Sequence, residues 1–339
     1  MYTNKKILKW FDKEKRNLPW RNSNKSNIDT YKVWISEIML QQTKVNAVIP
    51  YFQKFINKFP DINSLASSSL EDVLSYWAGL GYYSRARNVH KCADIIVTQY
   101  NGSFPKTEKE LIKLPGIGDY TASAICAIAY NEFAIAVDIN IERVISRIYN
   151  KHNLKREDIK SLIKEIIPID RPGDFTEALM DLGSMICKAR QPNCLNCPVN
   201  SICKTYLENK EALIKVIKTN KIKHIRYGNC YIVSRDTDKK LFFIRRPNNG
   251  LLGGMLSFPS SKWLEDKNKL YNEKLFEDFI KINKPLYVVN HIFSHFKLIL
   301  NIYNLKISNS IHIEGEWIEL NEAFQQLPSL MKKVAKIII

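Results

Sequence analysis

The sequence lacks any apolar run close to the roughly 20 residues that a membrane-spanning helix needs. Residues 1–6 also lack the apolar core of a signal peptide. From these two absences we expect a cytoplasmic, nucleoid-associated protein. Disulfide bonds are rare in such a reducing compartment, so the seven cysteines should be free thiols unless they bind a metal.

Acidic residues are few relative to basic ones. The chain has 34 Asp and Glu against 51 Lys and Arg, which gives a formal net charge of +17. Such a surplus is typical of proteins that bind a polyanion such as nucleic acid. A proteome rich in lysine and isoleucine would produce a similar surplus, so the charge favours nucleic acid without identifying it. The length of 339 residues is comfortable for two domains.

Strand-like alternation is absent before residue 220, where helical periodicity dominates. We therefore predict an all-α domain over residues 1–206. Residues 207–224 are rich in lysine and mostly lack a core pattern, which is typical of a linker. Beyond them the period changes and predicts an α+β domain over residues 225–339. Its predicted elements are strands over residues 231–233, 241–244, 286–289 and 298–307 and a helix over residues 266–283.

Residues 114–122 read Leu-Pro-Gly-Ile-Gly-Asp-Tyr-Thr-Ala and predict a tight turn between two helices. Gly116 and Gly118 accept positive φ, so backbone N–H groups of the turn can point at an anion. The next helix would present its N-terminus to the same anion. This pattern predicts two helices within residues 107–130 whose connecting turn holds a phosphate, the segment that the resemblance described below implies to be a helix-hairpin-helix. An ordinary glycine-rich turn is the alternative, because Gly-x-Gly alone is a weak signal.

Asp138 follows the second of these helices. A carboxylate is an unexpected group beside a phosphate backbone unless it takes part in chemistry. The alternative is that Asp138 is an ordinary helix cap.

Glu37 lies in a predicted helix whose other residues are mostly apolar. Burial there would raise the pKa of its carboxyl group, because desolvation disfavours the charged form. The alternative is a glutamate that turns to solvent or pairs with a cation, and helix geometry by itself favours that alternative. Gln42 and Thr43 close the helix, where a long amide side chain suits contacts with base edges or the DNA strand.

A compact segment over residues 78–87 combines glycines, tyrosines and arginines at a predicted helix start. The ring of Tyr82 could wedge between bases, and Arg85 and Arg87 could bind phosphates. A tyrosine pair in the core beside solvated arginines is an equal alternative.

Four cysteines, Cys187, Cys194, Cys197 and Cys203, follow the spacing C-x6-C-x2-C-x5-C. Thiols so close together in a reducing compartment do not form a comfortable disulfide framework. Zinc sites favour two separated C-x2-C pairs, whereas short unequal spacings suit a 4Fe–4S cluster. The spacing therefore favours an iron–sulfur cluster over zinc, and zinc stays the alternative.

Taken together, these motifs resemble those of the MutY-type adenine DNA glycosylases, and the resemblance runs nearly end to end. The matching segments are residues 34–43, 79–87, 114–122 and 180–183, Asp138 with Asn140 and Arg143, the cysteine loop, residues 250–259 and residues 293–296. The resemblance implies a helix-hairpin-helix Gly/Pro–Asp fold with one 4Fe–4S cluster and a C-terminal Nudix-like domain. It also implies base excision repair, in which adenine opposite 8-oxoguanine or guanine is removed from duplex DNA, and we expect a monomer.

The resemblance assigns roles to particular residues. Glu37 would protonate the adenine ring, and ionised Asp138 would stabilise the cationic sugar or bond to it transiently. Asn140 and Tyr120 would assist by hydrogen bonding near the sugar. Tyr82 would be the wedge that holds the duplex open after the base has flipped out. Lys188 and Arg190 of the cysteine loop would provide a second basic contact with DNA.

Two positions distinguish this chain from relatives. Endonuclease III-type enzymes have a Schiff-base lysine where this chain has Tyr120, and tyrosine cannot form an imine. We therefore predict a monofunctional glycosylase with little strand cleavage. Ile139 stands where the family usually has glycine, and its β-branched side chain restricts the backbone beside Asp138.

The C-terminal domain lacks the Arg-Glu-x2-Glu-Glu motif with which a Nudix hydrolase binds its catalytic metal. We therefore interpret it as a recognition module for 8-oxoguanine. By resemblance, Phe293 would stack, Ser294 would hydrogen-bond and His295 would reach a phosphate. Without the resemblance, a strand-end aromatic and a solvated histidine would be the better interpretation.

Two other functions remain open from the sequence. One is an iron–sulfur glycosylase for oxidised pyrimidines, against which Tyr120 and the C-terminal domain argue. The other is a non-catalytic DNA-scanning protein, against which the presence of both Glu37 and Asp138 argues.

Overall fold

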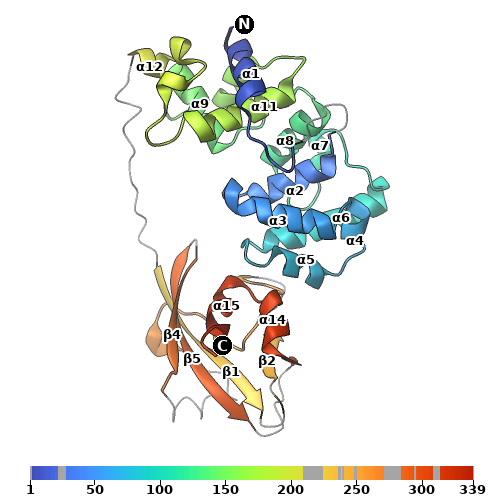
Figure 1. Cartoon of the computed structure of the whole chain (residues 1–339), viewed down its shortest axis with the longest axis vertical. Coiled ribbons are helices and arrows are strands. Elements are labelled where there is room, and N and C mark those ends of the chain that lie inside the picture. The colour runs from blue at the N-terminus through green and yellow to red at the C-terminus, as the bar shows by residue number, and fades with distance from the viewer. Residues whose placement is uncertain are drawn as a thin grey trace. The chain divides into compact units, whose positions relative to one another are not determined.

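The chain forms two compact units (Figure 1). The first consists of Met1–Ser67 and Asn88–Lys218, and the second of Ser68–Arg87 and Thr219–Ile339. This computed structural model describes residues 2–21, 28–208, 224–235, 238, 240–247, 250–270, 284–293, 295–307 and 314–338. The domain boundaries at residues 206 and 225 remain a prediction. The compact units differ from the predicted domains because Ser68–Arg87 belongs to the second unit. Most of the predicted linker, residues 209–223, lies outside the described residues.

The first unit is helical in its described residues, as the periodicity predicts. Its helices are α1 (Tyr2–Glu14), α2 (Thr30–Leu40), α3 (Val45–Lys58), α4 (Ile62–Ala66), α7 (Glu108–Leu111), α8 (Asp119–Tyr130), α9 (Ile139–Tyr149), α10 (Arg156–Lys164), α11 (Pro172–Asp181) and α12 (Lys204–Glu208), with short η1 (Leu182–Ile186), η2 (Cys194–Asn196) and η3 (Asn200–Ile202). Helix α6 (Ser84–Tyr100) begins in the second unit and continues into the first. No helix among the described residues has the length and apolar character to cross a membrane.

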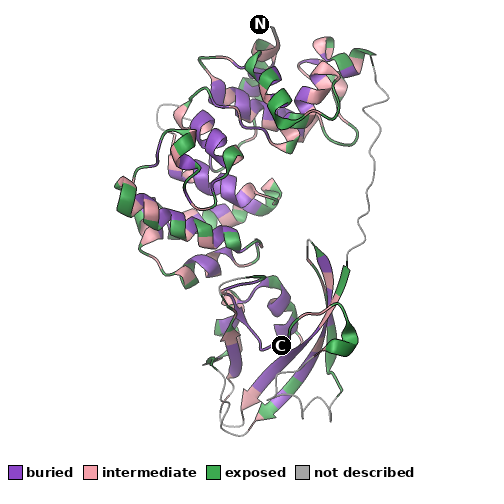
Figure 2. Ribbon diagram, turned by 180° about the vertical axis from the view of Figure 1, so that it is seen from behind, coloured by how far each residue is buried: buried purple, intermediate pink, exposed green. Residues whose placement is uncertain are grey.

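Helix α8 of the first unit packs against α2, α7 and α11, and buried residues, drawn purple, gather where the helices of this unit face one another (Figure 2). The small residues of α8 allow neighbouring helices to approach closely, and seven consecutive residues from Thr121 to Ala127 are buried. Gly173 at the start of α11 lies so close that an added Cβ would be 2.4 Å from the carbonyl oxygen of Ala127. This close packing of α2, α8 and α11 places their residues around one cleft.

The second unit contains a mixed sheet. Its strands are β1 (His224–Arg235), β2 (Leu241–Arg245), β3 (Leu256–Ser257), β4 (Tyr287–Ile292), β5 (Phe296–Ile307) and β6 (Glu316–Ile318). They follow the order β3-β2-β1-β5-β4, and β6 pairs with β2. Strands β1 and β5 run parallel over their whole length, from the pair His224 and Phe296 to the pair Arg235 and Ile307.

Three helices of the second unit are α5 (Leu70–Trp77), α14 (Leu320–Gln326) and α15 (Ser329–Ala335). Helix α14 contacts both α5 and α15, and α15 contacts β4. Strands and helices together confirm the predicted α+β class. Of the predicted helix over residues 266–283, the described part contains only the 3₁₀ turn η5 (Lys267–Lys269), and residues 271–283 lie outside the described residues.

Candidate active site

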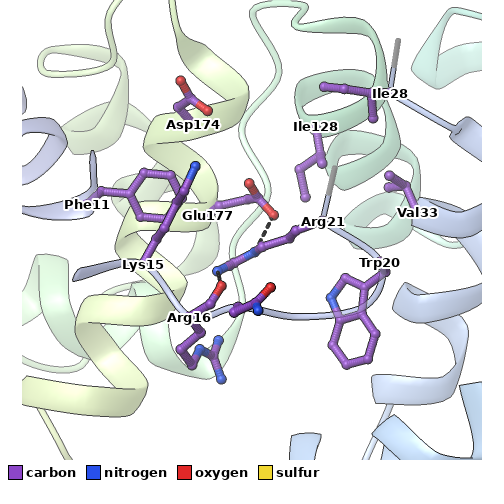
Figure 3. Close-up of a pocket in the computed structure, with 11 residues that line it drawn as sticks. Phe11, Lys15, Arg16, Trp20, Arg21, Ile28, Val33, Ile128, Asp174 and Glu177 are labelled. Atoms are coloured by element: carbon purple, nitrogen blue, oxygen red, sulfur yellow. Dashed lines mark hydrogen bonds and ion pairs between the residues drawn. The ribbon is translucent and has the colours of Figure 1, made fainter. Parts of the chain in front are cut away.

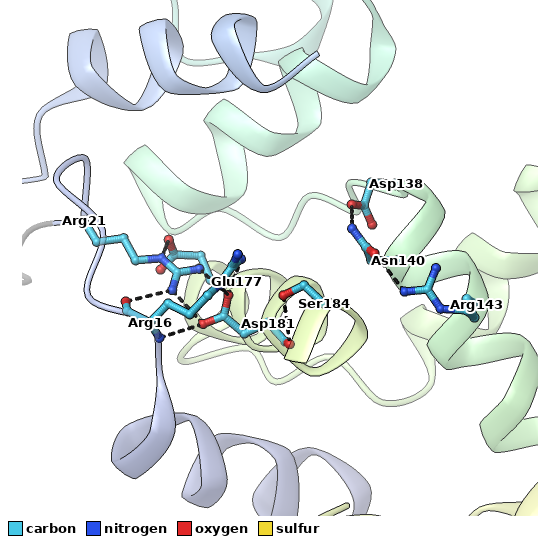
Figure 4. A network of polar contacts seen from close by, with 8 residues as sticks. All are labelled: Arg16, Arg21, Asp138, Asn140, Arg143, Glu177, Asp181 and Ser184. Carbon is cyan, nitrogen blue, oxygen red and sulfur yellow. Dashed lines mark hydrogen bonds and ion pairs between the residues drawn. The ribbon is translucent and has the colours of Figure 1, made fainter. Parts of the chain in front are cut away.

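Asp138 is the N-cap of α9. One carboxylate oxygen accepts a hydrogen bond of 2.7 Å from the backbone N–H of Ile141, as an N-cap aspartate does. The other accepts a hydrogen bond of 2.8 Å from the side-chain amide of Asn140 (Figure 4). The carboxylate is therefore a helix cap and is also held in one orientation by two donors.

A chain of hydrogen bonds continues from Asn140 to the cysteine loop. The Asn140 side-chain oxygen accepts from Nη2 of Arg143 at 2.8 Å (Figure 4). Arg143 also donates to the carbonyl oxygens of Gly183 at 2.6 Å and Cys187 at 2.7 Å. An added Cβ on Gly183 would lie 2.7 Å from Cβ of Asn140, so glycine is needed for this approach. The first turn of α9 is thus fixed to the backbone of the first cysteine.

Glu37 on α2 is only 6% exposed although it carries an ionisable carboxyl group. Burial, opposed by a hydrogen bond from the Tyr120 hydroxyl and aided by the negative charge of Asp138, raises the pKa of Glu37 to about 7. Burial and the same two carboxyl groups raise the pKa of Tyr120 well above its ordinary value. A substantial share of the molecules therefore keeps Glu37 protonated at neutral pH, which is the state that a general acid needs.

One cleft of about 850 Å³ brings the predicted catalytic residues together. It is lined by Glu37, Tyr120, Asp138 and Asn140 and, among the predicted DNA-binding residues, by Gln42, Thr43 and Gly118. Two carboxyl groups and a phenol thus line one space.

Gly116 and Gly118 act differently in the turn before α8. Gly116 has a φ of +79°, and an added Cβ would lie 2.8 Å from Cβ of Asn88. Gly118 is the N-cap of α8, and an added Cβ would meet nothing within 4 Å. Gly116 therefore permits the turn, whereas Gly118 leaves space in front of the α8 N-terminus.

Ile139 is the first residue of α9, where a β-branched residue needs no unusual backbone. Its side chain is 75% exposed and lines the cleft. The departure from the family's glycine therefore adds apolar surface beside Asp138.

A smaller cavity of about 250 Å³ has Arg16 in common with the cleft (Figure 3). Trp20, Arg21 and Glu177 also line it. Sequence reasoning missed these residues; the only available signals were the segment Leu-Pro-Trp-Arg at residues 18–21 and the motif over residues 180–183.

A buried ion network lies next to this cavity (Figure 4). Arg21 contacts Glu177 and Asp181, each at 2.7 Å, and Arg16 contacts Asp181 at 2.6 Å. Asp181 is fully buried. Burial alone would raise its pKa, but the two arginines lower it below the usual range. Removing Arg21 would take away the cation that pairs with the largely buried Glu177, and breaking such a pair is strongly destabilising.

The four cysteines Cys187, Cys194, Cys197 and Cys203 line one small apolar cavity together with Ile186, Pro192 and Tyr206. Arg147 of α9 donates to the Cys187 sulfur at 3.4 Å and to the Lys188 carbonyl at 2.7 Å. Within the described ranges, no three His, Cys, Asp or Glu side chains converge on one ion position. The four thiols instead line the wall of one cavity. Four thiols around such a space, with the cation of Arg147 beside them, fit an iron–sulfur cluster. Lys188 and Arg190 are exposed on this loop.

Tyr82, Arg85 and Arg87 lie in the second unit. Tyr82 is 36% exposed and has a φ of +50°. Arg85 is buried, with its guanidinium 5.4 Å from the ring centroid of Tyr82 and 3.1 Å from the carbonyl oxygen of Gly81. Arg87 donates to the carbonyl oxygen of Gly253 at 2.7 Å. Both arginines thus have structural partners, and their contact with DNA stays a prediction.

Phe293 is half-buried in an aromatic cluster of the second unit. Its ring centroid lies 4.9 Å from that of Phe296 and 5.7 Å from that of Trp263. His295 is exposed, and Ser294 lies outside the described residues. Phe293 therefore already has ring neighbours, and its stacking on a DNA base stays a prediction.

Comparison with known proteins agrees with this architecture. Residues 35–168 match the HhH-GPD superfamily of base excision DNA repair proteins, and residues 230–336 match the NUDIX domain. The adenine DNA glycosylase of Buchnera aphidicola subsp. Baizongia pistaciae is 36% identical over 98% of this chain and 94% of its own. That of Homo sapiens is 31% identical over 98% of this chain and 73% of its own. A solved non-covalent complex of endonuclease III with DNA matches with a TM-score of 0.53 and 25% identity, over 62% of this chain and 96% of that chain.

Proposed function

The chain belongs to the adenine DNA glycosylases of base excision repair, and from this membership we propose that its substrate is adenine opposite 8-oxoguanine or guanine in duplex DNA. We propose that it acts as a monomer and without cutting the strand. The observation that carries the proposal is the pair Glu37 and Asp138 in one cleft, one carboxyl group with a pKa raised to about 7 and the other fixed as a helix cap.

In the proposed mechanism the adenine leaves the base stack and enters the protein, at a cost of a few kcal/mol. Glu37 gives its proton to a ring nitrogen of adenine. The bond between the base and C1′ then breaks, and its electron pair leaves with the base. The positive charge left on the deoxyribose lies against Asp138 until water adds at C1′. The proton that this water loses passes to the Glu37 carboxylate and restores the acid.

We propose that the cavity beside the ion network receives the extruded base. Trp20 offers an aromatic face for stacking, and Glu177 and Arg21 offer acceptors and donors for the edge of a purine. The acceptor and the donor are held by their mutual contact of 2.7 Å, so they keep a fixed geometry.

The proposed function is tested with duplexes that contain adenine opposite 8-oxoguanine, adenine opposite guanine, or thymine glycol. We expect adenine release from the first two, no release of thymine glycol, and strand breaks only after treatment with alkali. Trapping of the protein on DNA by borohydride would contradict the prediction from Tyr120, because only an imine is trapped. Release of thymine glycol would favour an oxidised-pyrimidine glycosylase, and binding without any release would favour a scanning protein.

We propose that the cysteine loop holds one 4Fe–4S cluster. The cluster would supply a rigid support for the loop, and Arg147 would balance part of the thiolate charge. The purified protein is expected to absorb broadly near about 400 nm, as thiolate-ligated clusters do. Replacing Cys197 by serine should reduce this absorption, whereas replacing the isolated buried Cys92 by serine should leave the band unchanged. Stoichiometric zinc without the band would contradict the proposal.

We further propose that the C-terminal domain recognises 8-oxoguanine through Phe293, with Ser294 and His295. Phe293→Ala is expected to reduce the preference for 8-oxoguanine over guanine by about tenfold, because stacking on a base is worth about 1–3 kcal/mol. The measurement is the ratio of single-turnover rates on the two duplexes. Tyr287→Ala is the control, because Tyr287 is a 60% exposed aromatic residue of the neighbouring strand β4. An unchanged ratio for Phe293→Ala, or an equal loss in both variants, would contradict the role of Phe293.

A further inference from the structure

Arg156 contributes a guanidinium group to the wall of the catalytic cleft. It is the first residue of α10 and is exposed. Its Nη2 donates a hydrogen bond of 3.2 Å to the carbonyl oxygen of Val137, the residue directly before Asp138. The backbone that carries Asp138 therefore also anchors this cation.

The cleft that Arg156 lines also contains the carboxyl groups of Glu37, Asp119 and Asp138, and no ion pair between described residues joins Arg156 to them. Three cations line the cleft, namely Arg16, Lys44 and Arg156. Arg16 is committed to the buried carboxylate of Asp181, with Nε at 2.7 Å and Nη2 at 2.6 Å from Oδ1. None of the ion pairs between described residues involves Arg156.

The acidic residues that follow Arg156 have other partners. Glu157 pairs with Lys160 at 3.6 Å, and a carboxylate oxygen of Asp158 accepts a hydrogen bond of 2.9 Å from the backbone N–H of Lys155. The bond from Arg156 to Val137 goes to an uncharged carbonyl, which orients the guanidinium without neutralising it. A cation that is oriented but not neutralised suits an anionic ligand.

We propose that Arg156 binds a phosphate adjacent to the target nucleotide once the deoxyribose of that nucleotide lies against Asp138. The sugar must reach Asp138 for the reaction, and each deoxyribose is flanked by two phosphates. A guanidinium anchored to Val137 lies next to that position, and its planar fork can donate two parallel hydrogen bonds to one phosphate. The inference rests on the proposed function, because it requires that duplex DNA is the substrate and that the target sugar reaches Asp138. It is independent of 8-oxoguanine recognition and of the cluster.

The experiment compares the affinity of the full-length protein for two duplexes of the same sequence. One contains a tetrahydrofuran abasic analogue, which can enter the cleft, and the other is undamaged. Arg156→Gln should weaken binding of the abasic duplex about tenfold and lower the slope of log affinity against log salt by about 1. Binding of the undamaged duplex should change less than about twofold, because its sugar does not reach Asp138. Arg156→Lys should regain part of the affinity, since it restores the charge but not the fork.

Lys155→Gln is the matched control. Lys155 precedes Arg156, is exposed and does not line the cleft, and its bond to Asp158 comes from its backbone rather than its side chain. It should affect both duplexes equally and weakly. The proposal would be overturned if Arg156→Gln and Lys155→Gln lost equal affinity for the abasic duplex. It would also be overturned if Arg156→Gln lost equal affinity for both duplexes, or lost no affinity at all. Adenine excision by the wild-type protein tests the proposed function separately. A failure of the proposed function can therefore be distinguished from a failure of the phosphate-binding role of Arg156.

Discussion

Replacing Asp138 by asparagine is expected to lower the single-turnover rate of adenine excision about a thousandfold, the loss found when one group that stabilises transition-state charge is removed. Asparagine has nearly the shape of aspartate, and its side-chain oxygen can still accept the hydrogen bond from Ile141 that caps α9. The negative charge beside the sugar is lost, however, and only the ionised carboxylate can balance a positive deoxyribose.

The control for this variant is Glu142→Gln. Glu142 is an exposed carboxylate in the first turn of the same helix, and it does not line the cleft. Its neutralisation should change the rate less than about twofold, because exposed charges contribute little. If Asp138→Asn retained a tenth of the wild-type rate or more, Asp138 could not be the residue that stabilises the sugar.

Glu37→Gln is expected to lower the excision rate about a hundredfold to ten-thousandfold, the range that general acid catalysis supplies. Glutamine keeps the size of the side chain but has no proton to give. The wild-type rate should also depend on pH, because the pKa of Glu37 is raised to about 7. Below that pH the carboxyl group is protonated and active, and above it the rate should fall about tenfold for each pH unit.

This fall of the rate above pH 7, the alkaline limb of the pH profile, should disappear in Glu37→Gln and persist in Glu142→Gln. The measurement is the single-turnover rate across the pH range, with the protein in saturating excess over the DNA. An alkaline limb that survives in Glu37→Gln would show that another group supplies the proton. The same limb in both variants would therefore contradict the assignment of the acid.

The raised pKa of Glu37 also makes a prediction about stability. In the unfolded chain the pKa of a glutamate is about 4.3. Between that pH and 7, Glu37 is therefore ionised in the unfolded state but mostly protonated in the folded state. The folded protein is thus stabilised by the buried neutral carboxyl group at low pH and loses this contribution as the pH rises through about 7. We therefore compare the free energy of unfolding of Glu37→Gln with that of the wild type at each pH. From about pH 5 to about pH 8 this difference should shift in favour of the variant by about 3 kcal/mol. Urea unfolding at the two pH values measures this change, and a relative loss at the higher pH would contradict it.

Much of the local structure could be predicted from the sequence, because it depends on residues close together in the chain. An aspartate before a helix predicts the cap at Asp138, and the glycine at position 116 predicts a turn with positive φ. The spacing of four cysteines predicts a shared site, and they do line one cavity. These features follow from backbone sterics, local hydrogen bonds and short chain separations, all of which can be read from a single sequence.

Only the tertiary structure decided how distant residues meet. Helix geometry alone favoured a solvated Glu37, but the packing of α8 on α2 buries it and places Tyr120 against it. The segment over residues 78–87 predicts that Arg85 binds a phosphate, and only the structure shows that its guanidinium is buried against aromatic rings. Arg156 belongs to no motif of the sequence, and only the structure places it on the wall of the cleft that Glu37 and Asp138 line. Desolvation and ion pairing depend on which helix faces pack together, and hydrophobic periodicity identifies an apolar face without identifying the residues that cover it.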